Sequence, residues 1–260
     1  MTAAMGSGPG TADGSPFLDV QEVWKTYQRG PERVRALSGV SLSLRAGEVV
    51  ALVGRSGSGK TTLLNVVCGW ERPDRGEVVW KEAKAGQAMA ERPWSDLAIV
   101  PQGLGLLEEL SIEENVGLPL RLARAGFSER EFARRPPSLL KALGLDRLAD
   151  RTPGEVSMGE QQRAALARAL VLVPTLLLAD EPTGHQDEGW ARGVFELLRL
   201  ASRRGVCCLV ATHNPEAVRF ADRVLHIRDG MLTAEKVEAA APRVPTQPPG
   251  GSPVPRGRMR

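Results

Sequence analysis

Long apolar runs are missing from this 260-residue sequence. The longest mostly apolar stretches, Ala164–Pro174 and Thr175–Ala179, fall well short of the roughly 20 residues that a membrane-spanning helix requires. The first residues lack both a basic start and an apolar segment, so they do not predict a secretory signal peptide. If the protein works at a membrane, we expect it to do so through a partner.

Cysteine is scarce, and charge of neither sign dominates. The three cysteines, Cys68, Cys207 and Cys208, make a poor disulfide framework because their number is odd and two are adjacent. Their scarcity favours a reducing compartment. Cys207–Thr212 is typical of a buried strand rather than a metal site, since no second spaced cysteine pair exists. With 34 basic and 31 acidic residues the charge is mixed, which gives no support to nucleic-acid binding.

The chain divides into an ordered middle and two ends of biased composition. Hydrophobic residues make up 42% and charged residues 25%, as in globular domains. Residues 1–16 and the Pro/Gly-rich residues 237–260 bury too little apolar surface to fold, so we predict disorder there. A single α/β domain is therefore expected over residues 17–236.

Hydrophobic patterning predicts a mainly parallel sheet with two additions. Alternation at Val40, Leu42 and Leu44 is typical of half-buried antiparallel strands, whereas the continuous run Val49–Val53 is typical of a strand buried on both faces. Residues 104–165 have helical spacing and predict an inserted helical subdomain, with breaks at Pro119, Pro136 and Pro137. The remaining elements alternate strand with helix: helix Lys60–Cys68, strands Glu77–Trp80 and Leu97–Val100, helix Met158–Val173, strand Thr175–Ala179, helix Gly189–Arg203, strand Cys207–Ala211, a short helix from Pro215, and strand Val224–Ile227 before a hairpin turn at Arg228–Gly230.

A phosphate-binding motif follows the first buried strand. It reads Gly54-Arg55-Ser56-Gly57-Ser58-Gly59-Lys60-Thr61 and continues with Thr62. Glycines let backbone N–H groups approach phosphate oxygens, and the following helix N-terminus adds its dipole. Lys60 would reach the β- and γ-phosphates of ATP, and the Thr61 hydroxyl would bind Mg²⁺. The alternative is a glycine-rich turn without a ligand.

Two acids end a later apolar strand. Asp180 follows Leu176–Ala179 and could hold the water shell of Mg²⁺, and Glu181 could polarise the attacking water. The alternative is simply a charged strand end. Beside the phosphate-binding motif, however, the pair favours a nucleotide hydrolase.

The segment before that strand indicates which hydrolase. It reads Val156-Ser157-Met158-Gly159-Glu160-Gln161-Gln162-Arg163, and with the other motifs it resembles the ATPase subunit of ABC transporters, especially the lipoprotein-release, macrolide-export and cell-division subgroup. The resemblance runs from about Phe17 to Thr233. Ser157 and Glu160 also form a capping box, so the segment is equally the start of a helix. A capped helix N-terminus would suit a γ-phosphate.

The resemblance implies roles for further residues. Gln102 matches the glutamine that senses Mg²⁺, and His213 matches the histidine that contacts the γ-phosphate. Asp187 matches an acid that couples two subunits. Tyr27, the only tyrosine, fits the aromatic that stacks on adenine, although Trp24 is a rival and either could be a core residue.

The family pattern is broken at two places. Met158 stands where the family has glycine, and a bulky side chain is hard to place where backbone should approach phosphate. His185-Gln186-Asp187 replaces the usual Asn-Leu-Asp. Because the remaining motif residues are retained, we expect active but slow hydrolysis.

The resemblance implies an assembly. Two copies would sandwich two ATPs head to tail, each phosphate-binding loop facing Ser157 and Gly159 of the partner. This homodimer would power an integral membrane permease at the cytoplasmic face of the cell membrane. Alternatives are a regulatory membrane complex without cargo, an ABC ATPase acting on DNA or ribosomes, and a small-molecule kinase.

Overall fold

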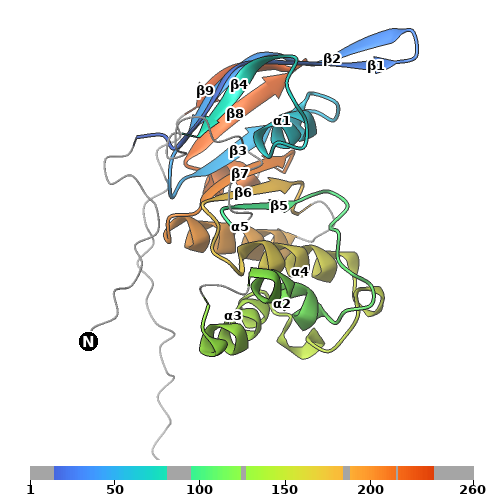
Figure 1. The fold of residues 1–260 in the computed structure, drawn as a ribbon, viewed down its shortest axis with the longest axis vertical. Coiled ribbons are helices and arrows are strands. Elements are labelled where there is room, and N and C mark those ends of the chain that lie inside the picture. The colour runs from blue at the N-terminus through green and yellow to red at the C-terminus, as the bar shows by residue number, and fades with distance from the viewer. Residues whose placement is uncertain (1–14, 81–94, 124–126, 184–187, 215, 237–260) are drawn as a thin grey trace, which may run out of the picture.

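A computed structural model of the chain describes residues 15–80, 95–123, 127–183, 188–214 and 216–236. The predictions of disorder for the two ends concern residues that lie almost entirely outside these ranges. Among the described residues, two sheets are stacked with helices between and below them (Figure 1). No helix in these ranges is both long and apolar enough to cross a bilayer.

The smaller sheet is antiparallel, as its alternating residues predict. Its strand order is β2-β1-β4, with β1 at Leu18–Arg29, β2 at Glu32–Leu44 and β4 at Arg75–Trp80. Val40, Leu42 and Leu44 are buried. Long pairing between β1 and β2 makes a hairpin that projects from the body of the molecule (Figure 1).

The larger sheet is parallel except for its last strand, and its order is β5-β6-β7-β3-β8-β9. β3 and β6 are the strands that lead into the two predicted ATP motifs. Asp229 and Gly230, both with positive φ, turn β8 into β9, which confirms the predicted hairpin. The strands span Val49–Val53 (β3), Leu97–Val100 (β5), Leu176–Asp180 (β6), Cys207–Thr212 (β7), Arg223–Arg228 (β8) and Met231–Lys236 (β9).

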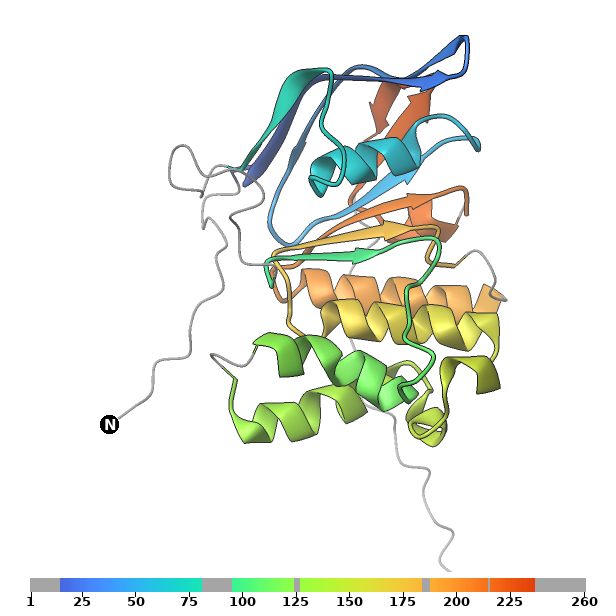
Figure 2. The same ribbon diagram turned by 45° about the vertical axis from the view of Figure 1, so that its right-hand side comes forward.

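Helices cover both faces of this sheet. α1 lies between the two sheets, whereas α4 and α5 run side by side below the parallel strands, with α2 and α3 beyond them (Figures 1 and 2). The helices span Lys60–Val67 (α1), Ile112–Ala123 (α2), Glu129–Ala142 (α3), Met158–Leu170 (α4), Glu188–Ser202 (α5) and Glu216–Phe220 (α6), with 3-10 turns at Asp146–Leu148 and Pro153–Glu155.

Alternate residues of β3 belong to two separate hydrophobic cores, one on each face of the sheet. Val50 and Leu52 pack with α1 and the antiparallel sheet, and Val49 and Ala51 pack with the helices of the opposite face. The predicted elements are thus present, with ends displaced by a few residues. Cys207 and Cys208 lie in fully buried β7, one in each core, where burial raises the pKa of the Cys208 thiol to about 12.

The predicted helix breaks are wrong. Pro119 lies inside α2, and Pro136 and Pro137 lie inside α3. Each proline removes one intrahelical hydrogen bond. The buried Pro136 ring packs close to Gly117 of α2, so a contact between the two helices offsets part of this loss.

Candidate nucleotide-binding and hydrolysis site

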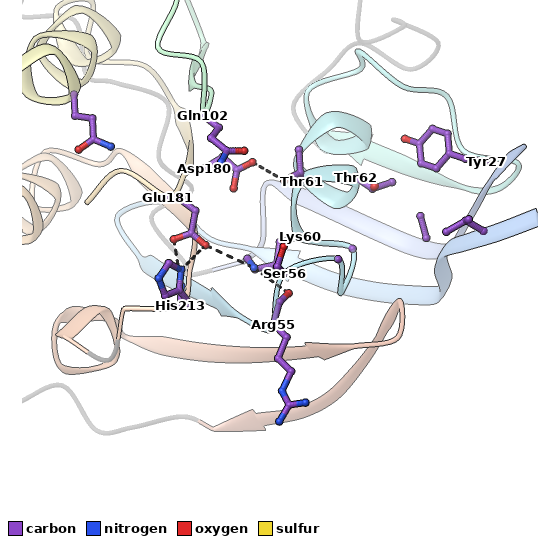
Figure 3. A pocket seen from close by; sticks show the side chains of 15 residues that line it. Tyr27, Arg55, Ser56, Lys60, Thr61, Thr62, Gln102, Asp180, Glu181 and His213 are labelled. Atoms are coloured by element: carbon purple, nitrogen blue, oxygen red, sulfur yellow. Dashed lines mark hydrogen bonds and ion pairs between the residues drawn. The ribbon is translucent and has the colours of Figure 1, made fainter. Parts of the chain in front are cut away.

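A cleft of about 820 Å³ opens at the carboxyl ends of β3, β6 and β7 (Figure 3). This edge of a parallel sheet is where α/β proteins bind ligands. The cleft is lined by Tyr27, Val34, Ala36, Arg55, Ser56, Gly57, Gly59, Lys60, Thr61, Thr62, Gln102, Gln162, Asp180, Glu181 and His213. The structure therefore brings most of the predicted site residues together.

The loop at residues 54–59 holds its shape because glycine is required at two points. A Cβ on Gly54 would collide with the Ile227 carbonyl oxygen of β8. Gly59 caps α1 with φ 108°, and a Cβ there would collide with the Ala36 carbonyl oxygen of β2. Strands from both sheets therefore close the loop from outside, and the loop backbone curls toward the cleft.

The loop has the donors that a phosphate would need. Two predicted loop residues, Gly54 and Ser58, do not line the cleft, and the buried Ser58 hydroxyl has no hydrogen-bond partner among the described residues. The Lys60 ammonium, 7% exposed, donates to the Gly54 carbonyl oxygen at 2.8 Å and the Arg55 carbonyl oxygen at 3.2 Å. A buried cation held by carbonyls of the loop, at the N-terminus of α1, suits an anionic ligand.

Thr61 and Asp180 join the two predicted ATP motifs. The Thr61 hydroxyl donates to an Asp180 carboxylate oxygen at 2.6 Å. Burial raises the pKa of the Asp180 carboxyl, the Thr61 hydrogen bond lowers it, and neighbouring Glu181 raises it further. A hydroxyl and a buried carboxylate in contact are the oxygen donors that Mg²⁺ prefers, and Figure 3 shows Gln102 beside them.

Glu181 is held from two sides. It follows β6 with φ 51°, a left-handed backbone that is costly for a residue with a Cβ. His213 contacts one carboxylate oxygen through Nδ1 at 3.0 Å and donates its backbone N–H to the other at 3.3 Å. The Lys60 ammonium lies 3.7 Å from Glu181. The carboxylate is thereby fixed at the cleft wall (Figure 3).

The other end of the cleft is formed by the antiparallel sheet. Tyr27 of β1 lines it together with Val34 and Ala36 of β2. Trp24, the rival aromatic residue, is absent from this lining. The Arg35 guanidinium carbon lies over the Trp24 ring instead, 6.0 Å from the ring centroid. The arrangement offers an aromatic ring and small apolar side chains to a flat ligand such as adenine.

The start of the third predicted motif lies outside this cleft. Ser157 caps α4, and Glu160 completes the predicted capping box. Neither Ser157 nor Gly159 lines the cleft, and Met158 is exposed. Asp187, like His185 and Gln186, lies outside the described residues.

Three lining residues were not predicted. Gln162, although buried, reaches the cleft from α4, and Val34 and Ala36 reach it from β2. Gln162 stands inside the quoted Ser-Met-Gly-Glu-Gln-Gln segment, which was a usable signal. Val34 and Ala36 carry no local signal, since β2 reaches the loop through a tertiary contact in which the Ala36 carbonyl oxygen lies against Gly59.

Comparison with known proteins agrees with this geometry. The profile of a family described as ABC transporter matches residues 37–184. The lipoprotein-releasing system ATP-binding protein LolD of Paramagnetospirillum magneticum is 42% identical over 83% of this chain and 96% of its own length. The macrolide export ATP-binding/permease protein MacB of Syntrophobacter fumaroxidans is 38% identical over 84% of this chain but 31% of its own length.

A solved structure shares the fold. The ATP-binding cassette MJ0796, a dimer in a post-hydrolysis state bound to ADP and phosphate, superposes with a TM-score of 0.76. It is 33% identical and covers 85% of this chain and 98% of its own. Profile, relatives and fold agree, and the chain belongs to the ABC transporter family as its ATP-binding and ATP-hydrolysing subunit.

Proposed function

We propose that this ATPase subunit binds ATP with Mg²⁺ in the cleft, works as a homodimer and drives a separate membrane permease. The observation that carries the proposal is the Thr61–Asp180 contact beside Glu181, which joins both ATP motifs in one cleft. Residues 54–62 would bind the phosphates and Tyr27 the adenine. Mg²⁺, held by Thr61, Asp180 and Gln102, would neutralise phosphate charge.

Hydrolysis is then a matter of positioning. Glu181 would orient a water molecule toward the γ-phosphate and accept its proton, and His213 would hold Glu181 in place. The N-terminus of α4 is exposed, which supports a contribution to the site of a second subunit. Ser157 and Gly159 of one copy would complete the nucleotide site of the other, with Asp187 at the interface between them. The dimeric state of the related cassette supports a dimer for this chain as well.

The names of the relatives support a transport role over a regulatory one. LolD is named for lipoprotein release, and MacB is named as ATP-binding protein and permease in one. By analogy, the present chain would dock on a permease encoded separately, at the cytoplasmic face of the membrane. Copurification from membranes followed by mass spectrometry would identify that permease.

The Glu181→Gln variant tests the catalytic assignment. Loss of the carboxylate should lower ATP turnover by about a hundredfold or more, because a general base contributes at least that much. Its ATP-bound dimer should then persist in size-exclusion chromatography. Glu196→Gln, at an exposed glutamate on α5, is the control and should behave as wild type. A Glu181→Gln variant that stays monomeric where wild type dimerises would refute the proposal.

A further inference from the structure

Arg168, in the last turn of α4, makes its hydrogen bonds outside its own helix. One guanidinium nitrogen donates to the Gly105 carbonyl oxygen and the other to the Leu104 carbonyl oxygen, both at 2.6 Å. These carbonyls belong to consecutive residues of the segment between β5 and α2. The planar fork of arginine suits two adjacent acceptors, and the point charge of lysine does not.

The segment held by Arg168 is a tight turn that contains Gln102. The Leu104 backbone N–H donates to the Pro101 carbonyl oxygen at 3.0 Å, which places Gln102 inside a hydrogen-bonded turn. Leu104 has φ 48° and Gly105 has φ 62°. A left-handed leucine is costly, so an outside contact must hold it there. Its buried side chain and the Arg168 fork are that contact.

Within the described ranges, an ion pair does not explain the position of Arg168. Among the described residues no carboxylate pairs with it, and burial lowers the pKa of its guanidinium. Burying a cation is costly, and the described partners that offset this cost are two carbonyl oxygens matched to the planar guanidinium. The contact is therefore suited to fixing the shape of the turn.

The same helix reaches the nucleotide cleft at other points. Its N-terminus carries Ser157, and Gln162 lines the cleft from its second turn. α4 thus contacts the catalytic region directly through Gln162 and indirectly, through Arg168, at the turn of Gln102. The residues after this turn are held by buried Asn115 of α2. Its side-chain oxygen accepts a hydrogen bond from the Leu107 backbone N–H, and its side-chain nitrogen donates to the Leu107 carbonyl oxygen.

We propose that Arg168 is a positioning residue for ATP hydrolysis, which holds the turn of Gln102 to α4. The inference rests on the proposed role of Gln102 in binding Mg²⁺. Arg168 itself does not touch the cleft, since it is absent from the lining residues.

A double-mutant cycle between Arg168 and Gln102 tests this role. Arg168→Met should lower kcat about tenfold and raise the Mg²⁺ concentration for half-maximal turnover severalfold. KM for ATP should stay within about twofold, because Lys60 and Tyr27 keep their surroundings. In the Gln102→Ala background the same substitution should change kcat less than about twofold.

Two further variants separate positioning from folding. Arg135→Met is the control, since Arg135 is partly buried and donates to the Val171 carbonyl at 3.0 Å and to Glu131 at 2.7 Å without contacting the Gln102 turn. It should lower thermal stability but leave kcat unchanged. Arg168→Lys keeps the charge and should fold normally, yet it should still lose about fivefold in kcat because it lacks the fork.

The outcomes are distinct. If the kcat losses of Arg168→Met and Gln102→Ala multiply in the double variant, the positioning role is overturned. A kcat loss in Arg135→Met equal to that in Arg168→Met would overturn it as well. Normal turnover and Mg²⁺ dependence in Gln102→Ala would instead refute the Mg²⁺ role of Gln102, and the present inference with it. The Glu181→Gln result is independent of both, so failure of the catalytic assignment remains recognisable.

Discussion

At the residue scale, Asp180 combines burial with charge. Burial raises the pKa of its carboxyl, so the folded chain binds this proton more tightly than the unfolded chain. The resulting stability is present below the ordinary aspartate pKa of about 3.9 and is lost as pH rises through the raised folded value. At neutral pH without Mg²⁺, ionised Asp180 therefore opposes folding.

Asp180→Asn should accordingly stabilise the fold and lower activity. We expect a melting temperature about 2 °C or more above wild type at pH 7 without Mg²⁺, and turnover lowered at least about tenfold. The difference in melting temperature should shrink as pH falls and vanish below about pH 3, where wild-type Asp180 is protonated in both the folded and the unfolded state. A variant less stable than wild type at pH 7 would contradict this account.

Val173 carries a second local cost, unrelated to the cleft. This β-branched residue has φ 57° between α4 and β6 and is 41% exposed. Val173→Gly should raise stability by about 1 kcal/mol, because a left-handed backbone costs an L-residue about that much. Val173→Ala still carries a Cβ and should gain distinctly less in thermal unfolding. Equal gains would mean that strain is not the cause.

Sequence reasoning found individual site residues where a local pattern exists. Lys60, Thr61 and Asp180 stand in motifs whose spacing reflects the backbone of a loop or strand end, and the structure brings them together. Val34 and Ala36 could not be predicted, because their place in the cleft depends on how β2 lies against the loop. The contact of Arg168 with the Leu104 and Gly105 carbonyls could not be predicted either, since it joins residues more than 60 positions apart in the sequence.

At the element scale, α3 and α4 begin with the same capping box but in different surroundings. Ser128 and Glu131 cap α3, and Ser157 and Glu160 cap α4. Ser128→Ala and Ser157→Ala should each cost about 1 kcal/mol of stability, the usual loss of an N-cap. Only Ser157→Ala should also lower ATP turnover, because only its helix start is proposed to meet nucleotide. Equal ATP turnover in the two variants would mean that Ser157 only caps α4 and does not contact nucleotide.

Element prediction succeeded where periodicity decided and failed where packing did. Buried β3 and β7 were recognisable from continuous apolar runs. The prolines of α2 and α3 were misread because local propensity disfavours them inside a helix. Packing of Pro136 near Gly117 is a tertiary contact that no local window contains.

At the scale of the whole molecule, Met158 is the departure that most concerns the dimer. Its side chain is 49% exposed in the first turn of α4. If this turn meets the ATP of a second copy, Met158→Gly should raise the ATPase rate several-fold, because the backbone could approach the phosphate. Met231→Gly, at a methionine that is also 49% exposed, is the control. No change or a decrease in the rate of Met158→Gly would refute the explanation.

The position of β3 in the sheet has a consequence for synthesis of the chain. β3 leads into the phosphate-binding loop, yet its neighbours are β7 and β8, which are translated far later. The Ser58 carbonyl oxygen accepts a hydrogen bond from the Gly230 backbone N–H, and Gly54 fits against Ile227. On the ribosome, we therefore expect the nucleotide loop to lack these contacts until the β8–β9 hairpin has emerged, so that partly made subunits would not consume ATP.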